Sequence, residues 1–377
     1  MFKGLRGLAS DVALISDIVL DLDGSVKPAW CLAEALAAKG FKVVFVSPFI
    51  SRGIEGYICE CGVIPMNLDV KLIVRNIDPS LIWLEVWMRE AFLRLNSINL
   101  KLNSNIIINF SHTISIDSSI WYLQGAPSIA LKDIKPYMPL RFKLIYDAIK
   151  PLIDYSDRKL VEEIYEKSAI AIANSKFCAS MYSRWGVKIH SVIYPPIDID
   201  VFHPSTSKPS SDYVLAYFGK ETKFDVIRKV ADRGVRIKAF GSKMFMIPKY
   251  LLRHPNIEFL GRVSTERLVD LYSNALYTIF PFTHEPFGYI PLESMACGTP
   301  VLTYGVQGPS EVVVDEVTGW LIGDDREFVD KAVELWVDGY DPTIRRVCRD
   351  RAYKFDRARY IEEWMGILDK LCESAVR

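Results

Sequence analysis

The chain reads Glu285-Pro-Phe-Gly-Tyr-Ile-Pro-Leu-Glu-Ser-Met-Ala-Cys-Gly-Thr-Pro300 between two apolar segments, residues 275–280 and 300–303, which have the composition of buried strands. Pro291 is compatible only with the first turn of a helix, so the stretch predicts a loop and then a short helix that opens near Gly288. Strand, loop, helix and second strand form the repeating unit of a parallel α/β sheet.

Two carboxylates accompany the predicted helix start. Glu285 lies in the loop, and Glu293 lies about one and a half turns inside the helix. The first amides of a helix have no partner within it and can hold phosphate or sugar oxygens. Those amides belong to Phe287, Gly288, Tyr289 and Ile290. The stretch predicts a ligand site, and the alternative is an ordinary helix with a surface glutamate at each end.

The same alternation of apolar strands and amphipathic helices runs through the rest of the chain. A segment rich in Pro and Ser at 195–211 interrupts it and predicts a domain boundary. We expect an N-terminal Rossmann-like domain over 1–195, a C-terminal one over 196–355, and a closing helix over 356–377 that packs back toward the first domain. The predicted fold is therefore α/β, with two doubly wound parallel sheets that face a central cleft.

Composition excludes some classes of protein. Among 377 residues, Lys and Arg total 46 and Asp and Glu total 46, so no overall positive field attracts a nucleic acid. No uncharged apolar run is long enough for a membrane span, and Asp11 and Asp17 interrupt the only candidate leader segment. The seven cysteines lack zinc-ligand spacing. We expect free thiols and a cytoplasmic protein.

The stretch E-P-F-G-Y-I-P-L-E, followed by S-M-A-C-G-T-P-V, resembles the donor-site signature of retaining glycosyltransferases with the GT-B fold, above all family four. The resemblance is strong over residues 169–323 and weak over 1–168. It implies metal-independent transfer of a hexose-type sugar from a nucleotide-diphosphate sugar, such as a UDP- or GDP-sugar, with no cofactor. The implied acceptor is a hydroxyl of a glycan, a lipid-linked molecule or a small molecule.

The resemblance also implies roles for residues of the C-terminal half. Glu293 would bind the ribose of the donor, and Glu285 with the backbone of 287–289 would hold its sugar. The nucleotide base would lie near Arg262, Val263 and Tyr272.

The family places Arg directly after a strand-ending glycine and Lys about five residues later. Here Gly219 is followed by Lys220, and the second lysine, Lys223, comes early. We expect both lysines to neutralise the leaving phosphate, with two solvated lysines at a helix start as the alternative.

In the N-terminal half, Gly24 and Ser25 stand at the family's glycine-rich loop but lack its paired glycines; they could approach the diphosphate. Gln124 stands where the family often has a histidine at the end of a strand near the reacting sugar. Glutamine can hydrogen-bond a hydroxyl but cannot take its proton. His112, which follows the predicted strand 105–110, is the alternative, and an ordinary loop histidine is the other interpretation.

A competing motif begins in the apolar segment 12–20, which predicts the first strand. Asp21 and Asp23 after it resemble the nucleophile and the acid/base of haloacid dehalogenase-type phosphatases, with Asp324 and Asp325 as remote magnesium ligands. A nucleotide-sugar epimerase and a non-catalytic glycosyltransferase-like subunit also stay open.

Residues 132–150 carry alternating basic and aromatic side chains. They predict either an amphipathic surface helix or a peripheral contact with an anionic membrane at the cytoplasmic face, where a lipid-linked acceptor would be presented.

Overall fold

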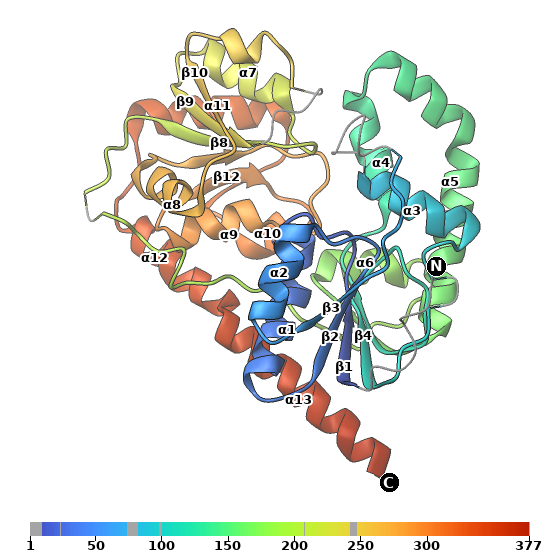
Figure 1. The fold of residues 1–377 in the computed structure, drawn as a ribbon. Helices are drawn as coiled ribbons and strands as arrows, with labels where there is room; N and C mark the ends of the chain where they lie inside the picture. The colour runs from blue at the N-terminus through green and yellow to red at the C-terminus, as the bar shows by residue number, and fades with distance from the viewer. Residues whose placement is uncertain are drawn as a thin grey trace. The chain divides into compact units, whose positions relative to one another are not determined.

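The computed structural model describes residues 10–22, 24–73, 82–97, 100–206, 208–241 and 247–376. The chain divides into two compact units, each built on its own parallel sheet (Figure 1). Unit 1 comprises residues 1–131, 144–196 and 360–377, and unit 2 comprises 132–143 and 197–359. The prediction of two Rossmann-like, doubly wound α/β domains is confirmed.

Unit 1 contains a seven-stranded sheet in the order β3-β2-β1-β4-β5-β6-β7, with every neighbouring pair parallel. Its strands are β1 (Ser10–Ile15), β2 (Val43–Ser47), β3 (Ile64–Asn67), β4 (Ser104–Asn109), β5 (Ser118–Leu123), β6 (Ser168–Ala173) and β7 (Ser191–Val192). Its helices are α1 (Lys27–Ala38), α2 (Arg52–Glu60), α3 (Ile82–Leu93), α4 (Pro127–Ile134), α5 (Leu140–Glu166), α6 (Lys176–Ser183) and α13 (Arg357–Val376), and η1 (Gly24–Val26) is a short 3-10 turn. α4 and α5 cross the boundary between the units, because residues 132–143 group with unit 2.

The apolar residues of β1 and β2 are buried because helices cover both faces of such a sheet. The closing helix α13 supplies part of this core. Its Trp364 is fully buried, with ring centroids 5.3 Å from Phe110 and 5.7 Å from Tyr122. The hydroxyl of Tyr360 donates to the carbonyl of Pro28 at 2.8 Å. The C-terminal residues thus complete the core of unit 1.

Unit 2 contains a six-stranded parallel sheet in the order β10-β9-β8-β11-β12-β13. Its strands are β8 (Val214–Phe218), β9 (Ile237–Gly241), β10 (Ile257–Gly261), β11 (Thr278–Phe280), β12 (Val301–Tyr304) and β13 (Gly319–Ile322). Its helices are α7 (Phe224–Asp232), α8 (Thr265–Asn274), α9 (Tyr289–Ala296), α10 (Pro309–Val312), α11 (Asp325–Asp338) and α12 (Ile344–Ala352). In each sheet the first strand of the unit, β1 or β8, lies inside the sheet, and later strands are added on both sides of it. Ligands bind such sheets at the point where the strand order reverses.

The first strand is shorter than the sequence predicts. The apolar segment predicts a strand over 12–20, but β1 ends at Ile15, and beyond it Val19 forms only a single bridge, to Ile50. The chain leaves the sheet because Asp17 turns to accept hydrogen bonds from the loop that follows β4. Within the described residues, no helix has both the length and the apolar composition needed to cross a membrane.

Candidate functional site

The strand order of unit 2 reverses between β8 and β11, and the loops that leave these strands are joined to each other. Thr222 and Phe282 form an antiparallel bridge. The backbone amide of Lys223 donates to the carbonyl of Pro281 at 2.9 Å, and the amide of Thr283 donates to the carbonyl of Glu221 at 2.7 Å. The sequence segment that begins at Gly219 and the one that contains Glu285 therefore form a single structure.

Gly288 starts the helix that the sequence predicts at this place. It has φ 112°, in the left-handed region, and is the residue before α9. A β-carbon here would lie 3.3 Å from Cγ of Pro309, so a larger residue would be both strained and crowded. α9 begins at Tyr289, after β11, so its first amides lie at the carboxyl end of the strands, the end at which parallel α/β sheets generally bind ligands.

Glu285 is anchored by the loop that follows β12. Its amide donates to the side-chain oxygen of Gln307 at 2.7 Å, and its carbonyl accepts from the amide of Gly308 at 3.1 Å. Its own Oε1 accepts from the amide of Phe287 at 3.3 Å. The backbone of this loop is thus fixed on both sides of the carboxylate.

The carboxyl of Glu285 has an unusual acidity. Burial, and then the negative charge of Glu221, raise its pKa to about 7, although hydrogen bonds from the backbone and the charge of Lys220 act in the opposite direction. Glu285 therefore changes charge near neutral pH. Perturbed acids of this kind gather at functional sites, which supports its choice as a site residue.

Glu293 and Tyr272, both predicted for the nucleotide side of the site, lie together. The hydroxyl of Tyr272, at the end of α8, donates to Oε2 of Glu293 at 3.2 Å. Burial, and then the charge of Glu293, raise the pKa of Tyr272 well above its usual value, so the phenol stays protonated as a donor. Arg262 and Val263 lie in the loop between β10 and α8, at the same end of the sheet.

The two predicted lysines have different surroundings. Nζ of Lys223 lies 2.8 Å from Oδ1 of Asp325 and 4.1 Å from the centre of the Tyr304 ring, whose hydroxyl donates to the same carboxylate oxygen. Nζ of Lys220 has a longer contact of 3.4 Å with Glu221, and its side chain is 41% exposed. Lys223 therefore has the shorter ion pair and the less exposed side chain of the two lysines, at 19%.

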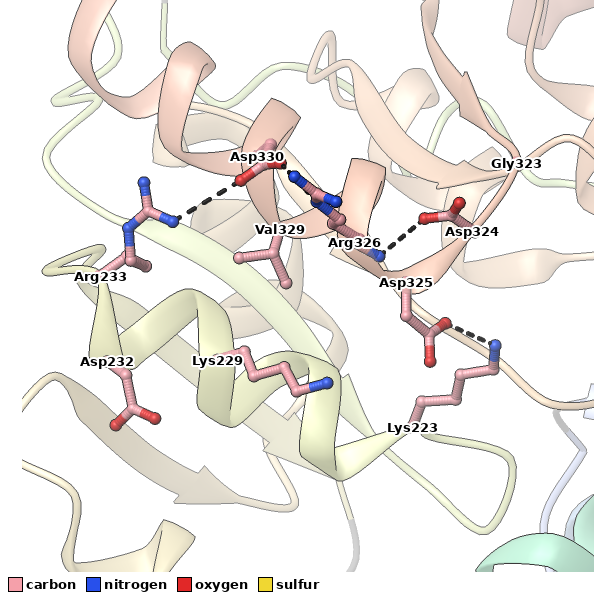
Figure 2. Close-up of a pocket in the computed structure, with 10 residues that line it drawn as sticks. All are labelled: Lys223, Lys229, Asp232, Arg233, Gly323, Asp324, Asp325, Arg326, Val329 and Asp330. Carbon is pink, nitrogen blue, oxygen red and sulfur yellow. Dashed lines mark hydrogen bonds and ion pairs between the residues drawn. The ribbon is translucent and has the colours of Figure 1, made fainter.

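Figure 2 shows the pocket that Lys223 lines, between α7 and α11. It has a volume of about 1010 Å³, and acidic and basic side chains alternate around it. Lys223 points to Asp325 at its edge, and Arg233 and Arg326 both contact Asp330 on α11. Four basic and four acidic side chains line the pocket, so its formal charges cancel.

Gly219 ends β8 under tight packing. Its amide donates to Oγ1 of Thr222 at 2.9 Å, and a β-carbon on it would come within 2.2 Å of the Tyr217 ring. A larger residue here would require the Tyr217 ring to move.

In unit 1 the structure brings Gln124 and Ser25 together. The amide nitrogen of Gln124 donates to the carbonyls of Ser25 and Phe110, each at 3.0 Å. Gly24 precedes Ser25 with φ 59°. The Gln124 side chain therefore joins η1 to the residue that follows β4 through its amide nitrogen.

His112 is neither a surface loop histidine nor open to a substrate. It is 7% exposed, with Nε2 3.0 Å from Oδ1 of Asp157 and Nδ1 3.1 Å from the hydroxyl of Tyr182. Both ring nitrogens have partners within unit 1, and the catalytic role of His112 stays a prediction.

The phosphatase motif does not form. β1 ends at Ile15, well before Asp21, so no strand presents that carboxylate, and Asp23 lies outside the described residues. Asp324 accepts from the amides of α11 as its N-cap, and Asp325 pairs with Lys223. Among the described residues, no cluster of His, Cys, Asp and Glu could hold a metal ion.

Several residues of this region were missed by the sequence analysis. Glu221 lies between the two candidate lysines, but the sequence does not indicate that its charge acts on Glu285. The only local feature that marks Gln307 is the glycine that follows it, Gly308. His284, 4% exposed, contacts Asp133 through Nδ1 at 2.9 Å, and no local pattern connects these two positions.

Comparison with known proteins gives three further findings. Residues 246–355 match the family model described as glycosyl transferases group 1. A D-inositol 3-phosphate glycosyltransferase of Mycolicibacterium smegmatis is 27% identical over 196 residues, 45% of each chain, and one of Mycobacterium bovis is 28% identical over 44% of this chain and 38% of its own. The match thus spans less than half of the length of these curated relatives.

Among solved structures, the sucrose-phosphate synthase of Thermosynechococcus elongatus superposes with a TM-score of 0.71 at 17% identity, over 97% of this chain and all of the other. Anabaena HepE in complex with UDP-glucose gives a TM-score of 0.67 at 14% identity, over 95% and 99% of the two chains. At this identity the likeness establishes the fold.

Proposed function

We propose that this chain is a retaining glycosyltransferase, because residues 246–355 match the family model of the group 1 glycosyl transferases and the chain has the GT-B fold. It transfers a hexose-type sugar from a nucleotide-diphosphate sugar to an acceptor hydroxyl. One observation carries the proposal: the Glu285 loop and the start of α9 lie where the strand order of unit 2 reverses.

The donor would lie along this edge of the sheet. Glu293, oriented by Tyr272, binds the ribose hydroxyls, and the base lies toward Arg262 and Val263. Glu285 and the backbone of 287–290 hold the sugar. Curated relatives carry the name D-inositol 3-phosphate glycosyltransferase, and HepE was crystallised with UDP-glucose, which makes a UDP-sugar the first donor to test.

The reaction needs positive charge at the leaving diphosphate. We assign this role to the helix-start amides and to Lys220, whose contact with Glu221 is longer than that of Lys223 with Asp325 and whose side chain is more exposed. In a front-face reaction the bond from the anomeric carbon to phosphate breaks, the bond to the acceptor oxygen forms on the same face, and the departing phosphate oxygen takes the acceptor's proton. That Gly24 and Ser25 approach the diphosphate, and that Gln124 hydrogen-bonds a hydroxyl near the reacting sugar, stay predictions for unit 1.

Isothermal titration with UDP, UDP-glucose and GDP-mannose tests the donor site. Glu285→Ala and Glu293→Ala should each weaken binding at least about tenfold, since each removes charged hydrogen bonds. Glu334→Ala, on the surface of α11, is the matched control. Unchanged affinity in both site variants would overturn the proposal.

Product analysis then separates the remaining functions. Proton NMR should show a product with the anomeric configuration of the donor. Conversion of the nucleotide sugar to an epimer in a reaction that contains no acceptor would indicate an epimerase. Donor binding without turnover across glycan, lipid and polyol acceptors would indicate a non-catalytic subunit. This alternative is retained because Gln124 stands where the family often has a histidine.

We also propose that α5 contacts an anionic membrane at the cytoplasmic face. Its exposed apolar side chains include Leu144 at 62%, Leu152 at 54% and Tyr155 at 62%, with Arg141 and Lys143 at its start. An apolar face beside basic residues is typical of helices that lie in the membrane interface.

Co-sedimentation with phosphatidylglycerol vesicles at low and high salt tests this contact. The Leu144→Ser, Leu152→Ser double variant should stay in the supernatant, whereas Val337→Ser on α11, equally exposed at 73%, should still sediment. Failure of the unmodified protein to sediment at low salt would contradict the proposal.

A further inference from the structure

The strand order of unit 1 reverses between β1 and β4 (Figure 1), and the loops that follow these strands emerge side by side. Ile15 and Asn109, the last residues of the two strands, are paired in register, and the amide of Phe110 donates to the carbonyl of Ile15 at 2.8 Å. Asp17 and Ser111 each follow two residues later. This is the place where a doubly wound sheet binds its ligand.

Asp17 is held there by one of its two carboxylate oxygens. Its Oδ1 accepts from the hydroxyls of Ser111 at 2.6 Å and Thr113 at 2.7 Å, and from the amide of His112 at 3.2 Å. Its backbone carbonyl accepts from the hydroxyl of Ser47 at 2.7 Å. Oδ2 accepts no hydrogen bond from any residue that the structure describes, and the side chain is only half-buried. One oxygen is fixed, and none of the residues in the described ranges donates to the other.

The loop that fixes Asp17 is itself rigidly supported. Asn109 accepts from the amide of Ser111 at 2.9 Å and donates to the carbonyl of Ile114 at 2.9 Å. His112 lies in the sequence between Ser111 and Thr113, the two residues whose hydroxyls donate to Asp17. Its ring contacts Asp157 and Tyr182 in the core. A side chain held through several hydrogen bonds from a supported loop is the arrangement that precise ligand binding requires.

We propose that Asp17 binds hydroxyl groups of a polyhydroxylated acceptor through Oδ2. An ionised carboxylate accepts hydrogen bonds and donates none, and a bond from a hydroxyl to a charged acceptor is among the stronger ones. Gln124, at the end of β5 on the same edge of the sheet, presents a further acceptor oxygen. The inference rests on the proposed function for the identity of this ligand as acceptor, and it assigns Asp17 a positioning role with no proton transfer.

Two isosteric variants isolate this role. Asp17→Asn keeps an oxygen for Ser111, Thr113 and His112 but replaces the charged Oδ2 with an amide. Asp11→Asn is the matched control, because Asp11 lies toward the opposite end of β1 and its carboxylate accepts a hydrogen bond from the backbone amide of Lys42 at 2.8 Å. Thr113→Val removes one of the bonds to Oδ1 and serves as a second, milder variant if Asp17→Asn fails to fold.

Saturation-transfer NMR with myo-inositol and methyl α-D-glucopyranoside, on the full chain with and without UDP, measures polyol binding directly. Asp17→Asn should weaken binding at least about tenfold with an unchanged melting temperature, Thr113→Val should weaken it less, and Asp11→Asn should not change it. Equal binding by the unmodified protein and Asp17→Asn, or no binding by the unmodified protein, would overturn the inference.

The donor site is measured separately. If the protein binds no nucleotide sugar but binds polyols through Asp17, the proposed function fails and the site at Asp17 stands. If UDP binds normally to every variant and polyol binding ignores Asp17, the proposed function stands and this inference fails.

Discussion

Nε2 of His112 lies 3.0 Å from Oδ1 of Asp157, and neither side chain is open to solvent. Asp157 comes from the middle of α5 and also accepts from the indole of Trp87 and the amide of Ser128, each at 2.9 Å. One carboxylate therefore joins α3, the loop after β4 and the start of α4.

Asp157→Asn should destabilise the protein by about 3 kcal/mol, because a buried acceptor of three donors loses its charge and part of its bonding. Burial by itself would raise the pKa of Asp157, but hydrogen bonds from His112 and Ser128 outweigh it and hold the pKa below its usual value. The stabilisation is therefore present above the unfolded pKa and is lost as the pH falls through the folded one. Urea unfolding at pH 7 and in acid measures both effects. Asp154→Asn, on the exposed side of α5, should change little.

Glu285→Gln should stabilise the protein at pH 8 by roughly 1 to 3 kcal/mol, since one pKa unit corresponds to about 1.4 kcal/mol. The folded pKa of about 7 lies above the usual 4.5, so the unmodified protein loses stability as the pH rises between these values. The difference between the two proteins should shrink toward pH 5. A difference independent of pH would show that the carboxyl does not titrate in this range. Glu258→Gln, exposed on β10, is the control.

Lys220 and Lys223 should respond oppositely to truncation. Lys220→Ala should weaken UDP binding about tenfold or more with little change in stability, because its side chain reaches solvent. Lys223→Ala should lower the free energy of unfolding by about 1 to 3 kcal/mol, because Asp325 loses its partner and Tyr304 its cation. Calorimetric titration and urea unfolding of both variants decide the assignment. A larger loss of UDP affinity in Lys223→Ala would reverse it.

Gly308→Ala should displace the loop that carries Glu285. A β-carbon at this position would lie 2.3 Å from Cα of Phe287, which is backbone and cannot rotate away. We expect a loss of about 1 to 3 kcal/mol in stability and a clear loss of UDP affinity. Gly305→Ala, in the same loop, would meet Leu321 at an ordinary 3.5 Å and is the matched control. Equal behaviour of the two variants would show that the loop is not held as described.

The sequence by itself determined the α/β class, the two sheets and the position of the helix that starts after Gly288. These features follow from local rules, because strand and helix periodicity, a proline confined to a first turn and a glycine with positive φ all act within a few residues. It also placed Glu285 and Glu293 on the same loop and helix. Their roles stay predictions.

Only the tertiary structure decided which side chains meet. Lys223 pairs with a residue 102 positions away, and the hydroxyls around Asp17 lie 94 and 96 positions along the chain. The same distant contacts buried His112 and ended β1 before Asp21. Such pairings depend on which strands become neighbours in the sheet, and the residues adjacent to each partner in the sequence contain no signal for them.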